Sequence, residues 1–270
     1  MSHPRISIFA GSAKGNVNPL RTMEGQNTHM ARTTHEIAID TVHDEIVVPN
    51  PFAHALLIFR ANASGDEKPL RVIQGPRTMF GGSMDTDNVS IDIVNSELYV
   101  TQEGSDSILV FPSRGNGNIA PVRILHGPKT GMRFPRRVTI DPVNNLIAVV
   151  ASQGIMIFNR TDQGDVAPRC VITGPKTGLG GGEGFTLSKA LLYPPAKKII
   201  FGGGAQRVPK GHPGRQRAYT AVWNYGDCGD IAPVYRLEDG SGVFDINPAA
   251  KEIIMSGGRG IRIYHMPEAF

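Results

Sequence analysis

Acidic and basic side chains that could do acid–base chemistry stand just ahead of short alternating segments. Glu36 with the adjacent His35 could supply a general base or a metal ligand. Asp245 lies within another such segment, at a position where the other copies have Ala, Ser or Thr, and it could orient a substrate or balance charge there. The structural alternatives are a solvated loop pair and an ion pair. We expect Glu36, His35 and Asp245 to be the catalytic residues.

A second set of side chains has the chemistry of substrate binding. Arg137, which follows Arg136, could clamp a carboxylate or phosphate through two parallel hydrogen bonds. The alternative is that these arginines balance nearby carboxylates. His54 either transfers a proton or is a surface histidine. The predicted substrate-binding residues are Arg137, Asn88, His54, Glu183, Arg207 and His212.

Two members of this set, Arg207 and His212, belong to a long basic segment at 202–220. Its counterparts elsewhere in the chain are only a few residues long. Long loops in compact repeats are usually functional or disordered. We expect a basic lid that attracts anions, and the alternative is a solvated insertion.

The elements that must position these residues are repeats at a spacing of about 50 residues. One segment type recurs as ISIFAGSAKGNVNPLRTMEG, LLIFRANASGDEKPLRVIQG, ILVFPSRGNGNIAPVRILHG and IMIFNRTDQGDVAPRCVITG, with shorter copies at Ala221 and Ile261. A second type lies between them, as in HEIAIDTVHDEIVV and NVSIDIVNSELYV. Each repeat has four short strands, with a Gly-Asp or Gly-Asn turn before the fourth strand.

Repeated four-stranded meanders predict an all-β fold, a β-propeller of four-stranded blades. The strand count favours five blades. The alternative is six blades, of which one is incomplete. We expect residues 1–270 to form a single domain, closed by N-terminal and C-terminal strands in one blade. Trp223, on a third strand, is expected in the core.

The position of the site follows from aligning the repeats on the residues Asp40, Asp92, Asp141, Ser188 and Asn247. Four residues earlier stand Glu36, Asn88, Arg137, Gly184 and Val243. The scaffold positions repeat, whereas these positions differ in chemistry, which favours a site at the mouth of the propeller channel. The alternative is a wet channel in which water satisfies polar side chains.

On these repeats the chain resembles NHL-type and TolB-like β-propellers over nearly its whole length. The resemblance implies an enzyme of the regucalcin/gluconolactonase or streptogramin-lyase kind, or a binding scaffold. Regucalcin-like propellers hold a divalent cation with Glu, Asn and Asp side chains, and Glu36, Asn88 and Asp245 supply those types. Arg137 departs from that pattern, because a cation at the same level opposes a bound metal. We therefore expect no cofactor, with a divalent cation such as calcium as the alternative.

Composition narrows the class of partner. The chain has 28 Lys and Arg against 24 Asp and Glu, without a long basic run, so a polar or anionic small molecule fits better than nucleic acid. No apolar stretch resembles a membrane span or a signal sequence. We expect a cytoplasmic protein without membrane contact, in which Cys170 and Cys228 are reduced; one disulfide is the alternative.

The leading functional hypothesis is a small-molecule enzyme of the hydrolase, lyase or isomerase type, with an acid–base site at the channel mouth. The competing hypothesis is a non-catalytic propeller that binds a ligand or a protein. A third is nucleic-acid binding through the basic segment. The sequence contains no phosphate-binding loop, HExxH motif or CxxC pair that would indicate another chemistry.

Overall fold

The computed structural model describes residues 4–31, 36–81, 88–179, 188–203, 218–257 and 260–270. Within these residues the regular structure is β-strand, with five three-residue 3₁₀ helices. No helix in this part of the chain is long and apolar enough to cross a membrane. The chain divides into two compact units, Met1–Ile124 and Leu125–Phe270, which are described separately below.

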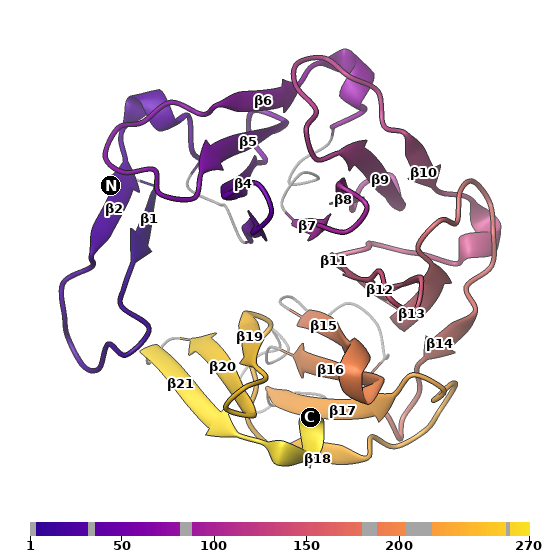
Figure 1. Ribbon diagram of the computed structural model, residues 1–270. Coiled ribbons are helices and arrows are strands. Elements are labelled where there is room, and N and C mark those ends of the chain that lie inside the picture. Colours follow the sequence, from indigo (N-terminus) through magenta and orange to yellow (C-terminus); the bar gives the residue numbers. More distant parts are fainter. Residues whose placement is uncertain (1–3, 32–35, 82–87, 180–187, 204–217, 258–259) are drawn as a thin grey trace, which may run out of the picture. The chain divides into compact units, whose positions relative to one another are not determined.

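The first unit contains antiparallel sheets in which consecutive strands pair (Figure 1). A two-stranded sheet comprises β1 (Arg5–Ile8) and β2 (Arg21–Glu24). The next sheet has four strands, β3 (Ala38–Asp40), β4 (Glu45–Asn50), β5 (Ala55–Arg60) and β6 (Arg71–Gln74). It is followed by β7 (Val89–Asp92), β8 (Glu97–Gln102), β9 (Ser107–Pro112) and β10 (Arg123–Leu125). The boundary between the two units falls within β10.

The second unit continues the same meander. One sheet comprises β11 (Arg137–Asp141), β12 (Leu146–Ala151), β13 (Gly154–Asn159) and β14 (Cys170–Ile172). The next comprises β15 (Ser188–Tyr193), β16 (Lys198–Gly203), β17 (Tyr219–Asn224) and β18 (Tyr235–Leu237). The last has three strands, β19 (Phe244–Asn247), β20 (Glu252–Gly257) and β21 (Gly260–His265).

Five consecutive sheets of three or four antiparallel strands define the fold as an all-β, five-bladed β-propeller, as the repeats predict. The strand ladders place β1–β2 and β19–β21 in separate sheets. The predicted joining of the terminal strands in one blade stays a prediction, as does the single domain.

The hydrophobic core of each unit lies between consecutive blades. In the first unit one cluster combines residues of β3–β6, such as Leu56 and Ile58, with residues of β7–β10, such as Leu98 and Phe111. In the second unit Trp223 is fully buried in a cluster that β11–β14 and β15–β18 share. The predicted core position of Trp223 is confirmed. Each blade is therefore stabilised by its neighbour.

Aspartates end the first strands of three blades and organise the turn that follows. Asp40, Asp92 and Asp141 are buried, and each accepts two backbone N–H hydrogen bonds at 2.9–3.0 Å from the following turn. A buried carboxylate is tolerated because such bonds replace its water. These aspartates are therefore structural.

The fourth-strand arginines tie each blade together, as their recurrence predicts. Arg71 binds Glu45 through two hydrogen bonds of 2.8 and 2.6 Å, and Arg123 binds Glu97 through two of 2.7 and 2.6 Å. At the equivalent position of the next blade stands Cys170, which forms a disulfide with Cys228. The expectation of reduced cysteines is wrong, because the turn before β18 brings the two Cα atoms to 5.6 Å.

Candidate functional site

The strand register fixes which residues begin the first strand of each blade, and it corrects the sequence alignment in one blade. Asp40 pairs with Glu45, Asp141 with Leu146, and Tyr193 with Lys198. Tyr193, not Ser188, is therefore the counterpart of the aspartates. Ser188 instead begins β15 and pairs with Gly203.

This correction changes the fourth member of the predicted mouth set. The residue four positions before Tyr193 is Lys189, so Lys189 replaces Gly184 as the counterpart of Arg137. The predicted binding residue Glu183 loses its equivalence with the other mouth positions, and it lies outside the described residues. The sequence analysis missed Lys189, although counting back from the Pro194–Lys197 turn would have found it.

In the second unit, Arg137 and Lys189 lie at the starts of consecutive first strands, within the first two residues of β11 and β15. Arg137 is the first residue of β11 and is only 4% exposed. Lys189 is the second residue of β15 and is half-buried, with its Nζ 5.9 Å from the centre of the Phe244 ring on β19. Thr139 donates a 2.7 Å hydrogen bond to the Ala190 carbonyl and so links β11 to β15. Two cationic side chains therefore stand at the same level of neighbouring blades.

Asp245, the predicted catalytic carboxylate of this unit, is exposed on β19. Its Oδ1 accepts a 2.9 Å hydrogen bond from the following backbone N–H of Ile246. Oδ2 is the second oxygen through which this carboxylate could accept a proton or a hydrogen bond. Its catalytic role stays a prediction.

In the first unit, Glu36 and Asn88 precede the first strands β3 and β7. Glu36 is half-buried, and Asn88 is 6% exposed. They occupy the positions that the repeats predict, but their proposed chemistry stays a prediction. The predicted base His35 lies outside the described residues, as do Arg207 and His212 of the long basic segment.

The backbone conformation at position 54 accounts for a histidine there. His54 occupies the left-handed region at φ 49°, immediately before β5, and Asp106 holds φ 49° at the same place before β9. His and Asp are among the residues that accept positive φ more readily than most. The Nδ1 atom of His54 is buried and has no hydrogen-bond partner among the described residues. A role in proton transfer stays a prediction.

Buried amide side chains at the ends of second strands hold the loops between blades. Asn50 Nδ2 donates to the His29 carbonyl at 2.6 Å, and Gln102 Oε1 accepts from Gly81 N–H at 3.4 Å. These amides are thereby committed to the backbone. Asn50 and Gln102 thus serve the scaffold at this end of the blades.

The metal alternative rests on Glu36, Asn88 and Asp245. The first two belong to the first unit and the third to the second unit, and one oxygen of Asp245 is held by its own backbone. No group of three or more His, Cys, Asp or Glu side chains within the described residues is arranged to hold a metal ion. We derive no metal-dependent step.

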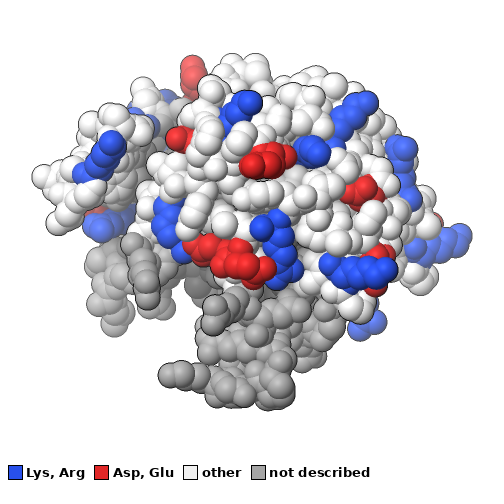
Figure 2. All heavy atoms as spheres, turned by 90° about the horizontal axis from the view of Figure 1, so that it is seen from below, with Lys and Arg blue, Asp and Glu red and all other residues white. Residues whose placement is uncertain are grey.

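Surface charge is mixed on the face that Figure 2 shows. Lysine and arginine side chains alternate there with aspartate and glutamate side chains. Nucleic-acid binding usually requires a continuous basic stripe or patch. This face does not have that character.

The comparisons with known proteins identify the class of protein as a β-propeller. The chain is similar to the crystal structure of a candidate 6-phosphogluconolactonase from Bacteroides uniformis, with a TM-score of 0.57 and 18% identity, over 93% of this chain and 70% of that one. It is also similar to hydrazine synthase from Kuenenia stuttgartiensis, with a TM-score of 0.54 and 11% identity, over 82% of this chain and 60% of that one. No protein-family model and no curated protein matches the chain. At these identities the likeness concerns the fold.

Proposed function

We propose that the protein is a small-molecule enzyme, of hydrolase, lyase or isomerase type, that acts on a polar, anionic substrate at the first-strand starts of the second unit. The observation that carries the proposal is the placement of Arg137 and Lys189 at the same level of consecutive blades. Guanidinium and ammonium groups held on strands form a preorganised cradle for a carboxylate or phosphate. Binding that group positions the remainder of the substrate.

The acid–base step falls to a carboxylate in this proposal. Asp245 lies on the next first strand, and a carboxylate in its position can act as a general base. Glu36 and His35 are separate candidates, to be tested by their own variants. Loss of turnover in Asp245→Asn with retained substrate binding would support this assignment of Asp245.

The candidate lactonase among the solved neighbours suggests which substrates to try first. A phosphorylated sugar lactone carries an anionic group for Arg137 and Lys189 and an ester bond that hydrolysis can open. The fold likeness alone does not assign this activity. It supports beginning with lactones that do and do not carry a phosphate.

The experiment compares hydrolysis of 6-phosphogluconolactone and of gluconolactone by the wild type, Arg137→Gln, Lys189→Gln and the control Lys251→Gln. Lys251 is an exposed lysine in the turn between β19 and β20. We expect each mouth variant to raise KM for the phosphorylated lactone by about tenfold or more, because it loses a charge-assisted hydrogen bond. KM for the uncharged lactone should change much less, and Lys251→Gln should match the wild type.

The proposal is wrong if both mouth variants bind and turn over anionic substrates as the wild type does. Circular dichroism of Arg137→Gln is needed, because Arg137 is buried. Tight binding of an anion without turnover across a broad panel of lactones and esters would favour the competing hypothesis, a non-catalytic ligand-binding propeller.

A further inference from the structure

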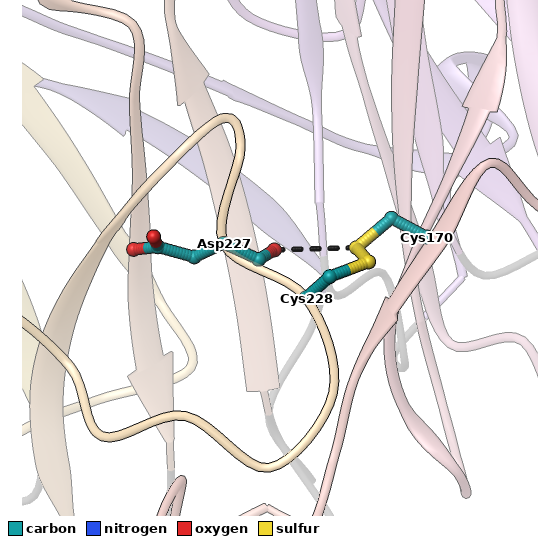
Figure 3. Close-up of a disulfide and its surroundings, with 3 residues drawn as sticks. All are labelled: Cys170, Asp227 and Cys228. Carbon is teal, nitrogen blue, oxygen red and sulfur yellow. Dashed lines mark hydrogen bonds between the residues drawn. A yellow bond between two sulfur atoms is a disulfide. The ribbon is translucent and has the colours of Figure 1, made fainter.

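The disulfide Cys170–Cys228 replaces the salt bridge of the preceding blades (Figure 3). Cys170 begins β14, where Arg71 and Arg123 begin their fourth strands. Leu146 stands where Glu45 and Glu97 begin their second strands. The ion pair within a blade is therefore exchanged for a covalent bond to the next blade.

This exchange accompanies an open cavity of about 460 Å³ beside the disulfide. Cys170 and Leu146 have shorter side chains than the Arg71–Glu45 and Arg123–Glu97 pairs at the corresponding positions of the two earlier blades. Both cysteines line the cavity, together with Leu146, Tyr225, Arg169 and Lys197. The residues that line it include two cations and no carboxylate.

Two carboxylates adjoin this cavity without lining it. Asp227, between the lining residues Gly226 and Cys228, turns its carboxylate away from the disulfide (Figure 3) and accepts hydrogen bonds from Asn224. Asp141 is fully buried and accepts hydrogen bonds from the Val143 and Asn144 N–H groups, from Asn144 Nδ2, and from Tyr225 Oη at 2.8 Å. Burial and the neighbouring carboxylate raise the pKa of Tyr225, so its hydroxyl stays protonated and donates to Asp141. A solute in the cavity thus meets the cations Arg169 and Lys197, which line it, and no carboxylate among the lining residues.

The backbone holds the two cysteines in place independently of the bond between them. Gly229 N–H donates to the Val171 carbonyl at 2.8 Å, and Thr173 N–H donates to the Gly229 carbonyl at 3.1 Å. The turn before Cys228 is closed by Asn224 N–H, which donates to Asp227 Oδ2 at 2.7 Å. Equivalent backbone bridges join the earlier blades, where no disulfide is present. Breaking the disulfide would therefore leave both sulfurs close together.

The two cysteines differ in exposure. Cys228 is exposed, whereas Cys170 is half-buried. The carbonyl oxygen of Asp227, the residue before Cys228, lies 3.2 Å from Cys170 Sγ (Figure 3). A protonated Cys170 could donate to that oxygen. Cys228 is thus the cysteine more open to attack, and attack there makes Cys170 the leaving group, from whose protonated thiol the Asp227 carbonyl can accept a hydrogen bond.

We propose that this cavity is a binding site for a small anionic thiol, which exchanges with the Cys170–Cys228 disulfide. The thiolate attacks Cys228 Sγ, the bond between the two cysteine sulfurs breaks, and a mixed disulfide forms on Cys228. The bonding electrons leave with Cys170 as a thiolate. This thiolate takes a proton from water, and the resulting S–H group donates a hydrogen bond to the Asp227 carbonyl. A second thiolate can then release the first as a symmetric disulfide, leaving both cysteines reduced.

The basic walls make the site selective for an anionic thiol. Arg169 Nη1 donates to Asn159 Oδ1 at 2.9 Å, which fixes its guanidinium at the rim, and Lys197 lies on the turn from the next blade. Cations near a reacting disulfide favour both the approach of an anion and the developing thiolate. The reacting thiolate of a neutral thiol carries one negative charge, whereas that of an anionic thiol carries two, so the anionic thiol gains more from the first effect.

The experiment measures mixed-disulfide formation by intact mass spectrometry after an acid quench, with 2-mercaptoethanesulfonate as the anionic probe and 2-mercaptoethanol as the neutral one. Rates are compared at equal thiolate concentration, because the thiolate is the nucleophile. We expect the anionic thiol to react about three- to tenfold faster at low ionic strength, with the advantage shrinking as salt is added. Peptide mapping should place the adduct on Cys228.

Lys197→Gln should remove most of the preference for the anionic thiol, and Arg169→Gln should lower it too. Lys251→Gln is the matched control, because Lys197 and Lys251 occupy the same turn position at φ 50° and 53°, and it should keep the wild-type preference. Equal rates for the two probes, an adduct on Cys170 alone, or no adduct with either thiol would overturn the proposal. None of these three results concerns Arg137 or Lys189, so this proposal and the proposed function can fail separately.

Discussion

Glu45 is a buried carboxylate of the first unit that binds two arginines. It is 5% exposed and accepts two hydrogen bonds from Arg71 and one of 2.7 Å from Arg114. Hydrogen bonds from Arg71 lower the pKa of Glu45, against the opposing effect of burial, and Arg114 lowers it further. The ionised form of Glu45 is therefore part of the folded structure.

Glu45→Gln should lower the free energy of unfolding at pH 7 by about 3 kcal/mol, because it leaves a mostly buried arginine without its counter-charge. A carboxylate with a lowered folded-state pKa contributes its stability above its unfolded pKa and loses it as the pH falls through the folded value. The difference between wild type and Glu45→Gln should thus be full at pH 7 and shrink below about pH 4. Urea unfolding at several pH values measures it.

Glu67→Gln is the matched control for this prediction. Glu67 also binds an arginine, Arg60, at 2.8 Å, but that arginine is 54% exposed. Water and salt screen such a pair, so its loss should cost much less. Equal effects of Glu45→Gln and Glu67→Gln would contradict the buried ion-pair role of Glu45.

At the scale of elements, a repeated hydrogen bond joins each outer turn to the next blade. An Asp or Asn side chain that follows a turn glycine accepts a backbone N–H hydrogen bond from the turn after the preceding fourth strand. The bonds, of 2.6–2.8 Å, join Asn27 N to Asp66, Arg77 N to Asn118, Lys129 N to Asp165 and Lys176 N to Asp230. The Gly-Pro-Lys/Arg-Thr segments that recur at 75–78, 127–130 and 174–177 thus serve blade geometry.

Gly75→Ala should disrupt one of these connections. Gly75 has φ 127°, and a Cβ there would lie 2.6 Å from the side-chain Oδ1 of Asn118. The combined backbone strain and overlap should lower the free energy of unfolding by about 3 kcal/mol. The control is Gly65→Ala, at φ 63° with open space around the added atom, which should cost only about 1 kcal/mol. Thermal or urea unfolding that ranks Gly65→Ala as the worse variant would contradict this reasoning.

Element types were predictable because the repeats carry their own turn chemistry. The Gly-Asp and Gly-Asn turns, the aspartate-ended first strands and the arginine-bearing fourth strands recur in sequence and in structure. The sequence analysis failed where a blade departs from the repeat. In β15, Tyr193 stands where the other blades have aspartate. The repeat pattern therefore points to Ser188, five positions earlier, as the counterpart. The disulfide was missed because a spacing of 58 residues reveals no proximity until the register of two blades is known.

The candidate site was less predictable than the fold, because the same polar residue types serve both scaffold and chemistry. Asn50 and Gln102 hold loops, and Asp40 closes a turn. Glu36, Asn88 and Arg137 stand where the repeats place them. A single sequence cannot separate these roles, since hydrogen-bond partners decide them and only the folded register shows those partners.

At the scale of the whole molecule, stability should follow nearest-neighbour contacts between blades. In the first unit one core cluster joins β1–β2 to β3–β6, through residues such as Met23 and Phe59. Another joins β3–β6 to β7–β10, through Leu56, Ile73 and Leu98. A blade buries its faces only against its neighbours, which is the behaviour of repeat architectures.

Leu98→Ala tests this coupling. Leu98 lies on β8, is fully buried, and contributes to the cluster shared by β3–β6 and β7–β10. Removing its side chain should lower the free energy of unfolding by about 3 kcal/mol through lost burial and a residual cavity. Because the cluster belongs to both sheets, amide hydrogen exchange should accelerate in β4 and β5 as well as in β8 and β9, and much less in β1 and β2. The exposed Leu20→Ala, at 71% exposure, should change neither quantity, and acceleration confined to β7–β10 would show that the blades are stabilised individually rather than by their neighbours.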